Sequence, residues 1–180
     1  MPDYGGDTLF ASMYAAYDAL SDGLKKTLEG LRALHSKTRA YQGLPQEREV
    51  SDSHRAKALA KFGAREAVHP VAPLHPESGR RLLFVNPNYT TRFEGWTEQE
   101  SEPLLTYLYR HAARPEFTYR FQWQEGSIAF WDNRSTAHLG PVDLASSDFD
   151  RRVERVTIAG DLPVGPDGFE SVPLRGELFT

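Results

Sequence analysis

The stretch Phe117-Thr-Tyr-Arg-Phe-Gln-Trp123 decides how the chain folds, because aromatic and polar side chains alternate along it. A period of two predicts a β-strand with one buried face. Glu125-Gly126 predicts a turn after it, and residues 128–131 predict a further strand. Residues 152–159 alternate in the same way. Strands therefore dominate the second half of the chain. This indicates a mainly β fold, an antiparallel sandwich or jelly roll with helical insertions.

Short elements are predicted at the start of the chain. Thr8–Phe10 predicts a strand, and Ser12 is placed to cap a helix that runs to about Leu20. Ser21 is placed to cap a second helix, whose apolar face would carry Leu24, Leu28 and Leu31. These signals predict two helices that follow the first strand directly in the sequence.

A hairpin and a longer helix are predicted in the middle of the chain. Two apolar runs, 67–74 and 81–85, flank His75–Arg80, whose proline and glycine suit a turn. Thr97-Glu-Gln-Glu100 is a capping box, so a helix is expected to begin there and to end before Pro115.

Length and composition restrict the class of protein. The 180 residues suit a single domain over 1–180, with a mobile loop that could act as a lid over 37–57 and an irregular tail over 162–180. A net charge of -4 gives no electrostatic signature of nucleic-acid binding. The absence of cysteine excludes disulfides, cysteine-zinc sites and a thiol nucleophile. No apolar run is long enough to span a membrane and no signal peptide is predicted, so we expect a cytoplasmic protein.

General catalytic motifs do not identify the chemistry. The six histidines form no zincin motif, and the chain has no nucleophile elbow, P-loop or dinucleotide fingerprint. Spacing alone therefore leaves the function open.

Several segments in a fixed order carry a family resemblance. Gly5-Gly-Asp-Thr-Leu-Phe10 comes first, Phe130-Trp-Asp-Asn-Arg-Ser-Thr-Ala-His138 follows much later, and Arg151 and Arg155 come last. With these segments the chain resembles the TauD/TfdA family of Fe(II)- and 2-oxoglutarate-dependent dioxygenases, over nearly its whole length. Further matching stretches are His69–Arg80, Leu83–Pro87 and Arg151–Asp161.

The resemblance implies a double-stranded β-helix, or jelly roll, and roles for four residues. His138 matches a metal ligand, and Arg151 and Thr8 match residues that hold 2-oxoglutarate. Arg155 matches the residue that binds an acidic group of the substrate. Arg151 and Arg155 are an even number apart, so a strand would point both to one face. A guanidinium suits a carboxylate because two parallel charge-assisted hydrogen bonds form.

Each of these residues also has a purely structural interpretation. A histidine after an aromatic strand is often an ordinary core or surface residue, and Thr8 could simply belong to its strand. The two arginines could be surface partners of Asp148, Asp150 or Glu154. Phe130 and Trp131 are expected in the core, and Asn133 and Arg134 are expected to fix the turn that leads to His138.

The chain departs from the family pattern at the metal site. The family supplies two further ligands from a His-x-Asp or His-x-Glu motif upstream of the Gly-Gly-Asp-Thr segment, and this chain has none there. Only His75-Pro-Glu77 fits the pattern, and it lies in the predicted hairpin turn. We therefore expect the C-terminal portion of such an enzyme, truncated at its N-terminus. Its missing strands would leave apolar surface and an unpaired sheet edge.

The resemblance implies hydroxylation of a small anionic substrate, with Fe(II) as cofactor, 2-oxoglutarate as co-substrate, and release of succinate and CO2. One imidazole makes a weak iron site, so little turnover is expected of this chain. The alternative is a non-catalytic relative that acts as an anion-binding or scaffold domain. The expected partner is a small molecule, with neither nucleic acid nor membrane, and a homo-oligomer is left open.

Overall fold

The structure is a computed structural model that describes residues 5–37, 65–140 and 153–176. The predicted loop over 37–57 lies outside the described residues except for Lys37, and Arg151 lies outside them as well.

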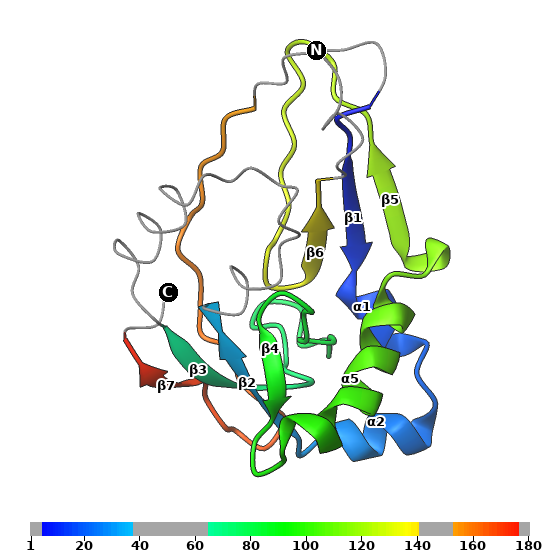
Figure 1. The fold of residues 1–180 in the computed structure, drawn as a ribbon. Helices are drawn as coiled ribbons and strands as arrows, with labels where there is room; N and C mark the ends of the chain where they lie inside the picture. The colour runs from blue at the N-terminus through cyan, green and yellow to red at the C-terminus, as the bar shows by residue number, and fades with distance from the viewer. Residues whose placement is uncertain (1–4, 38–64, 141–152, 177–180) are drawn as a thin grey trace.

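Two antiparallel sheets and a small set of helices make up the described chain (Figure 1). One sheet has three strands in the order β5-β1-β6, and the other has four in the order β4-β2-β3-β7. The elements, in chain order, are β1 (Thr8–Ser12), α1 (Met13–Asp18), α2 (Asp22–Leu28), β2 (Arg32–Ser36), β3 (Glu66–Pro70), β4 (Thr90–Phe93), α5 (Glu98–Ala112), the 3-10 helix η1 (Pro115–Phe117), β5 (Thr118–Phe121), β6 (Thr136–Leu139) and β7 (Val172–Arg175). The prediction of a mainly β fold with helical insertions is therefore confirmed.

The helices begin where the capping residues predict. The Ser12 side chain accepts from the backbone N–H of Ala15, and the Ser21 side chain accepts from that of Leu24. Thr97 and Glu100 form both halves of a capping box at the start of α5. Leu31 differs from expectation, because α2 ends at Leu28 and Leu31 packs against the core from the link that follows.

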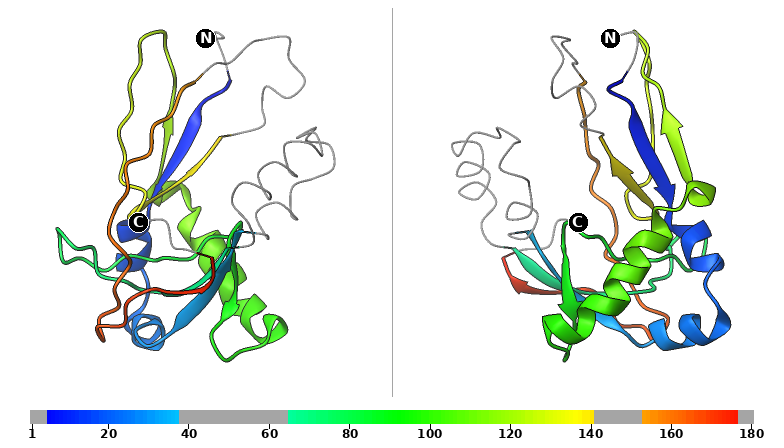
Figure 2. Two further views of the ribbon diagram at one scale, coloured as in Figure 1. Left: turned by 90° about the vertical axis from the view of Figure 1, so that its left-hand side faces the viewer. Right: turned by 45° about the vertical axis from the view of Figure 1, so that its right-hand side comes forward.

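The hydrophobic core lies where the helices meet the four-stranded sheet. Phe93 on β4, Leu108 on α5 and Leu28 on α2 have no exposed surface. Other members are Met13, Ala16, Tyr17, Leu20, Ala33, Val71, Ala72, Leu82, Leu83, Val85, Leu105 and Ala112. Because α1 follows β1 directly and is part of this core, the core fixes one end of the three-stranded sheet (Figure 2).

The predicted hairpin is present as paired backbone rather than as two regular strands. The Phe84 N–H donates to Val71 at 2.8 Å, the His75 N–H donates to Arg80 at 2.9 Å, and Leu74 bridges Arg81. Residues 82–85 are not assigned to a strand. The region predicted as an irregular tail contains a strand instead, because β7 lies within it and pairs with β3.

The strand predictions over 128–131 and 152–159 are wrong for the described residues, which have no assigned strand there. The prediction that Phe130 lies in the core is also wrong, because its side chain is 93% exposed. Trp131 is half-buried, and Tyr119, on the face of β5 predicted to be buried, is exposed. The physical reason is that an alternating pattern makes a strand only where a neighbour supplies hydrogen bonds and cover. No partner strand pairs with either segment in the part of the chain that the structure describes.

Among the described residues no helix is both long and apolar enough to cross a membrane.

Candidate functional site

One face of the three-stranded sheet carries two of the predicted site residues, Thr8 and His138. Phe10 on β1 pairs with His138 on β6, and Thr8 pairs with Phe121 on β5. Directly paired residues share a face of an antiparallel sheet, as do residues two apart on a strand. Thr8, Phe10, Phe121 and His138 therefore all lie on one face, which we call the site face. Thr8 and His138 are diagonal neighbours across β1 and β6, a placement that separates Cα atoms by about 7–8 Å.

His138 lies at the edge of an aromatic cluster on this face. Its ring centroid is 5.2 Å from that of Trp131 and 6.4 Å from that of Phe10. Partial burial lowers the pKa of His138, and the positive charge of Arg155 lowers it further. The imidazole is therefore neutral at pH 7, and the neutral form is the one that binds a metal ion.

Thr8 is held at the start of β1 by its neighbours. Its hydroxyl accepts a hydrogen bond from the indole N–H of Trp123 at 2.9 Å, and its side chain is buried. Gly5 and Gly6 precede it with φ values of 74° and 67°, which a residue with a Cβ rarely adopts. The buried Asp7 carboxylate pairs with Arg120 on β5. With one lone pair of its oxygen engaged, the Thr8 hydroxyl can donate its proton to an anion.

Sequence reasoning placed Trp123 on a buried strand face but missed its hydrogen bond to Thr8. The two residues are 115 positions apart, and only the register of β1 against β5 brings them together. The aromatic alternation predicts the side of the strand on which Trp123 lies, and it carries no information about its partner.

The site face opens into a hollow of about 370 Å³ lined by seven residues: Phe10, Tyr119, Phe121, Ala129, Phe130, Trp131 and Thr136. All of its aromatic members belong to β1, β5 or the segment before β6. The hollow is therefore continuous with the face that carries Thr8 and His138.

An ion-pair cluster fixes the turn that leads into β6. The Arg134 guanidinium contacts three carboxylates: Asp132 at 2.7 Å, Glu77 at 3.0 Å and Asp161 at 2.7 Å. It holds the pKa of Asp132 well below the usual range of an aspartate. The Asp132 side chain also accepts from the backbone N–H of Arg134 at 2.8 Å, closing the turn. Together with the Trp131–Asn133 hydrogen bond of 2.8 Å, this confirms the predicted role of Asn133 and Arg134.

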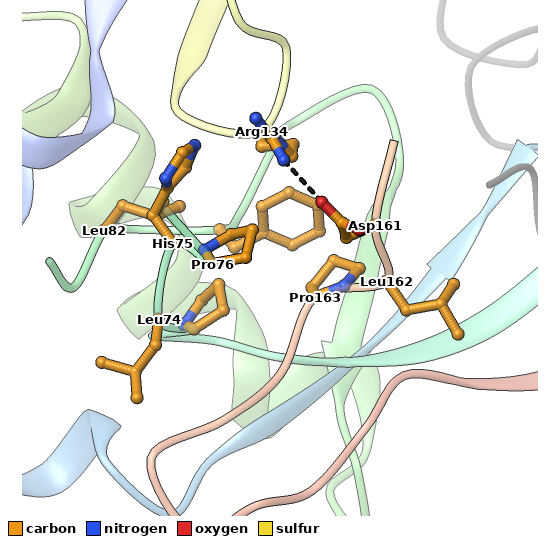
Figure 3. Close-up of a pocket in the computed structure, with 10 residues that line it drawn as sticks. Leu74, His75, Pro76, Leu82, Arg134, Asp161, Leu162 and Pro163 are labelled. Carbon is orange, nitrogen blue, oxygen red and sulfur yellow. Dashed lines mark hydrogen bonds and ion pairs between the residues drawn. The ribbon is translucent and has the colours of Figure 1, made fainter. Parts of the chain in front are cut away.

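Figure 3 shows the small cleft beside this cluster, with the Arg134–Asp161 pair above Pro76 and Pro163. Its enclosed volume is about 20 Å³. That is room for about one water molecule, so the cleft is too small for a substrate.

His75, Glu77 and Asp132 come close enough together to be tested as a metal site, because their ligand atoms lie within 4.8 Å of one another. The guanidinium of Arg134 already contacts both carboxylates, and His75 binds Asp132 at 3.0 Å. A metal ion would have to displace a paired cation. The group is therefore better described as a structural ion-pair cluster than as an iron site.

A pair of neutral histidines is packed within the second sheet. The rings of His35 on β2 and His69 on β3 are 4.8 Å apart, and Phe84 stacks on His35 at 5.6 Å. Burial lowers the pKa of His35 to about 3 and that of His69 to about 4. The Ser171 hydroxyl donates to the Pro163 carbonyl, so it accepts from Nδ1–H of His69 at 2.8 Å.

The described residues fit part of an iron-binding site. His138 is a neutral, accessible imidazole, but among the described residues it belongs to no group of three or more metal-ligating side chains. A single imidazole does not define a selective site. A metal ion at His138 would need further ligands from outside the described residues.

Comparison with known proteins gives a consistent result. The family model for the taurine catabolism dioxygenase TauD, TfdA family matches residues 1–157. An alkylsulfatase of Acinetobacter baylyi is 37% identical over 94% of this chain and 53% of its own length. An alpha-ketoglutarate-dependent sulfate ester dioxygenase of Pseudomonas putida is 36% identical, over 93% of this chain and 54% of its own. A crystal structure of a taurine dioxygenase from Burkholderia xenovorans superposes with a TM-score of 0.81 and 42% identity, over 98% of this chain and 55% of the other. The chain thus spans about half the length of the relatives it matches.

Proposed function

Because the chain belongs to the TauD/TfdA family, with the jelly-roll fold of its solved relatives, we propose that it contributes metal, co-substrate and substrate contacts to an Fe(II)- and 2-oxoglutarate-dependent dioxygenase. The substrate proposed is a small sulfate ester or sulfonate. The names of the Pseudomonas and Burkholderia relatives support this class. The observation that carries the proposal is the placement of Thr8 and His138 on one sheet face, with the charge of Arg155 acting on His138.

In this proposal His138 is a metal ligand. Its lowered pKa keeps a nitrogen lone pair available at neutral pH. Bound Fe(II) with 2-oxoglutarate and O2 would supply the oxidative chemistry: one oxygen atom of O2 would go to the hydroxyl group of the product and the other to succinate, with release of CO2. This chain's own contribution is to position and neutralise the charges of the two small molecules.

Thr8 and Arg151 are proposed to hold the carboxylate of 2-oxoglutarate that is remote from the metal. Support for Thr8 comes from its hydrogen bond with Trp123, which leaves the hydroxyl proton free to donate. Its diagonal distance from His138, about 7–8 Å between Cα atoms, suits a small diacid that reaches from one to the other. Arg151 lies outside the described residues, and its proposed role rests on the sequence match alone.

Arg155 is proposed to bind the anionic group of the substrate. Its guanidinium is close enough to His138 to lower the pKa of the imidazole, so a substrate anion bound there would lie near the metal position. A sulfate or sulfonate oxygen pair suits the planar guanidinium fork.

Calorimetry under anaerobic conditions tests these assignments. We expect the chain alone to bind Fe(II) weakly. Fe(II) should raise the affinity of the chain for 2-oxoglutarate, and in His138→Ala this effect of Fe(II) should disappear. Arg155→Leu is expected to keep the 2-oxoglutarate response and to lose binding of an alkyl sulfate. If His138→Ala keeps the full metal response, His138 is not a ligand and the proposal fails.

A second candidate function is an anion-binding domain without metal. The observation in its favour is that, among the described residues, His138 belongs to no group of three or more metal-ligating side chains. Under this alternative 2-oxoglutarate or alkyl sulfate binds equally well with and without Fe(II), and His138→Ala has little effect. The calorimetry above therefore separates the two.

A further inference from the structure

The Arg134 guanidinium joins three segments that lie far apart in the sequence. Its Nε and Nη2 donate to Asp132, in the turn before β6, and Nη2 also donates to Glu77, in the turn of the hairpin. Its Nη1 donates to Asp161 at 2.7 Å (Figure 3). Because the contact with Asp161 uses a different nitrogen, its loss would leave the other contacts of Arg134 in place.

Asp161 lies where the exposed segment that carries Arg155 joins the packed part of the fold. Residues 153–160 are all exposed. Shortly after Asp161 the chain is paired again, because the Leu74 N–H donates to the Val164 carbonyl at 2.8 Å. Asp161 is thus placed to decide the direction in which residues 153–160 leave the packed part of the fold.

Two features make the Arg134–Asp161 ion pair stronger than an ordinary surface pair. Gly160 lies against the aliphatic stem of Arg134, since a Cβ at Gly160 would be 3.7 Å from Cδ of the arginine. The guanidinium is also held by Asp132, through hydrogen bonds of 3.0 Å from Nε and 2.7 Å from Nη2, so little further side-chain entropy is lost when Asp161 binds. Isolated surface pairs contribute little, whereas networks with fixed geometry contribute more.

This ion pair connects the segment of the proposed metal ligand with that of the proposed anion-binding residue. Arg134 precedes β6, which carries His138, and Asp161 follows the segment that carries Arg155. Residues 141–152, which link the two segments along the chain, lie outside the described residues. Among the described residues, the ion pair is therefore a direct link between the two segments.

We propose that Arg134 and Asp161 are positioning residues that together set the place of Arg155 relative to His138. The inference rests on the proposed function, in which Arg155 binds the anionic group of the substrate. Neither positioning residue is assigned a contact with the substrate, because both act through the backbone of residues 153–161. A substrate anion then meets a guanidinium that is already in place, so less ordering entropy is lost on binding.

Spin labels test the position of the segment without any ligand. The chain has no cysteine, so in a Leu139→Cys, Val156→Cys double variant labels attach only at these two sites. Leu139 on β6 is 57% exposed, and Val156, next to Arg155, is 90% exposed. Electron paramagnetic resonance then gives the distribution of distances between the labels. Asp161→Asn should broaden this distribution, and Asp161→Glu, which keeps the carboxylate, should leave it close to that of the parent.

Glu77→Gln is the matched control in the same labelled background. The Glu77 and Asp161 side chains are similarly exposed, at 70% and 63%, and both pair with the same guanidinium. Glu77 lies in the hairpin turn and not beside residues 153–160, so its loss should leave the label distances unchanged. Circular dichroism of each variant checks that the fold is retained.

Anaerobic calorimetry with hexyl sulfate, in the presence of Fe(II) and 2-oxoglutarate, measures the effect on anion binding. Asp161→Asn is expected to weaken binding by roughly threefold to tenfold, as expected for the loss of one charge-assisted hydrogen bond that is partly exposed. Asp161→Glu and Glu77→Gln should each change the affinity by less than about twofold.

Three outcomes overturn the inference. One is an equal label distribution in the parent and in Asp161→Asn, and another is an equal broadening in Glu77→Gln. The third is a broadened distribution with unchanged binding of hexyl sulfate, because the ion pair then fixes the segment without positioning Arg155 for an anion. If instead Arg155→Leu binds hexyl sulfate as well as the wild type does, the proposed role of Arg155 fails, and the label distances still decide whether the ion pair sets the place of its segment.

Discussion

The histidine pair between β2 and β3 makes the stability of the chain depend on pH. In the unfolded chain both imidazoles take up protons below pH 6.5, whereas the folded chain keeps His69 neutral to about pH 4 and His35 to about pH 3. Stability is therefore lost as pH falls from about 6.5 toward 4. Between pH 7.5 and 5.0 each ring costs about 2 kcal/mol, so the two together cost about 4 kcal/mol.

Urea unfolding followed by circular dichroism at pH 7.5 and 5.0 measures this loss. His69→Gln keeps an N–H donor for Ser171 but cannot titrate, so its loss of stability should be smaller than that of the wild type by about 2 kcal/mol. Leu108→Ala on α5 serves as the control, because it lowers stability at both pH values without changing the difference. If His69→Gln loses as much stability as the wild type, His69 is not held neutral in the fold.

Three further predictions concern packing and the site. Arg134→Leu should lower the free energy of unfolding by about 1–2 kcal/mol, mainly because the partly buried Asp132 loses its charge-assisted hydrogen bonds, and it should cost clearly more than Arg114→Leu, at an exposed single pair. Urea titrations of both variants compare them directly, and equal effects would contradict the cluster. Leu108→Ala should cost about 2–5 kcal/mol in the same assay, because Leu108 is fully buried, and a smaller cost would mean that the site collapses around the lost volume. Trp123→Phe should weaken 2-oxoglutarate binding by roughly threefold to tenfold by removing the donor that orients Thr8, as expected for one neutral hydrogen bond; unchanged affinity in calorimetry would show that the indole does not act through Thr8.

Local signals were reliable where neighbours in sequence supply the contacts. Ser12, Ser21 and Thr97 cap helices because their side chains reach backbone N–H groups three residues on, so the sequence alone locates them. The turn at His75–Arg80 closes within its own hairpin for the same reason. Such elements need no knowledge of the rest of the fold.

Signals failed where the contact is made across the chain or is not made at all. Phe130 was predicted in the core from its apolar character, but burial requires a covering element and the described residues supply none. Trp123 reaches Thr8 only through strand register, which periodicity does not determine. The family resemblance selected His138 and Thr8, and the register of β1 with β5 and β6 explains how residues so far apart in sequence come to share one face.

The attachment of Asp161 to Arg134 has a consequence for the extended chain that precedes it. An ion pair 2.7 Å long, with Asp161 largely in solvent, tethers the end of the segment carrying Val156 and Ile158. Exposed charge pairs weaken as dissolved ions screen them, within about 8 Å at physiological ionic strength. Rising salt should therefore weaken the Arg134–Asp161 ion pair and free the segment that carries Val156 and Ile158. The exposed apolar side chains of that segment would then be free to pack against other apolar surface.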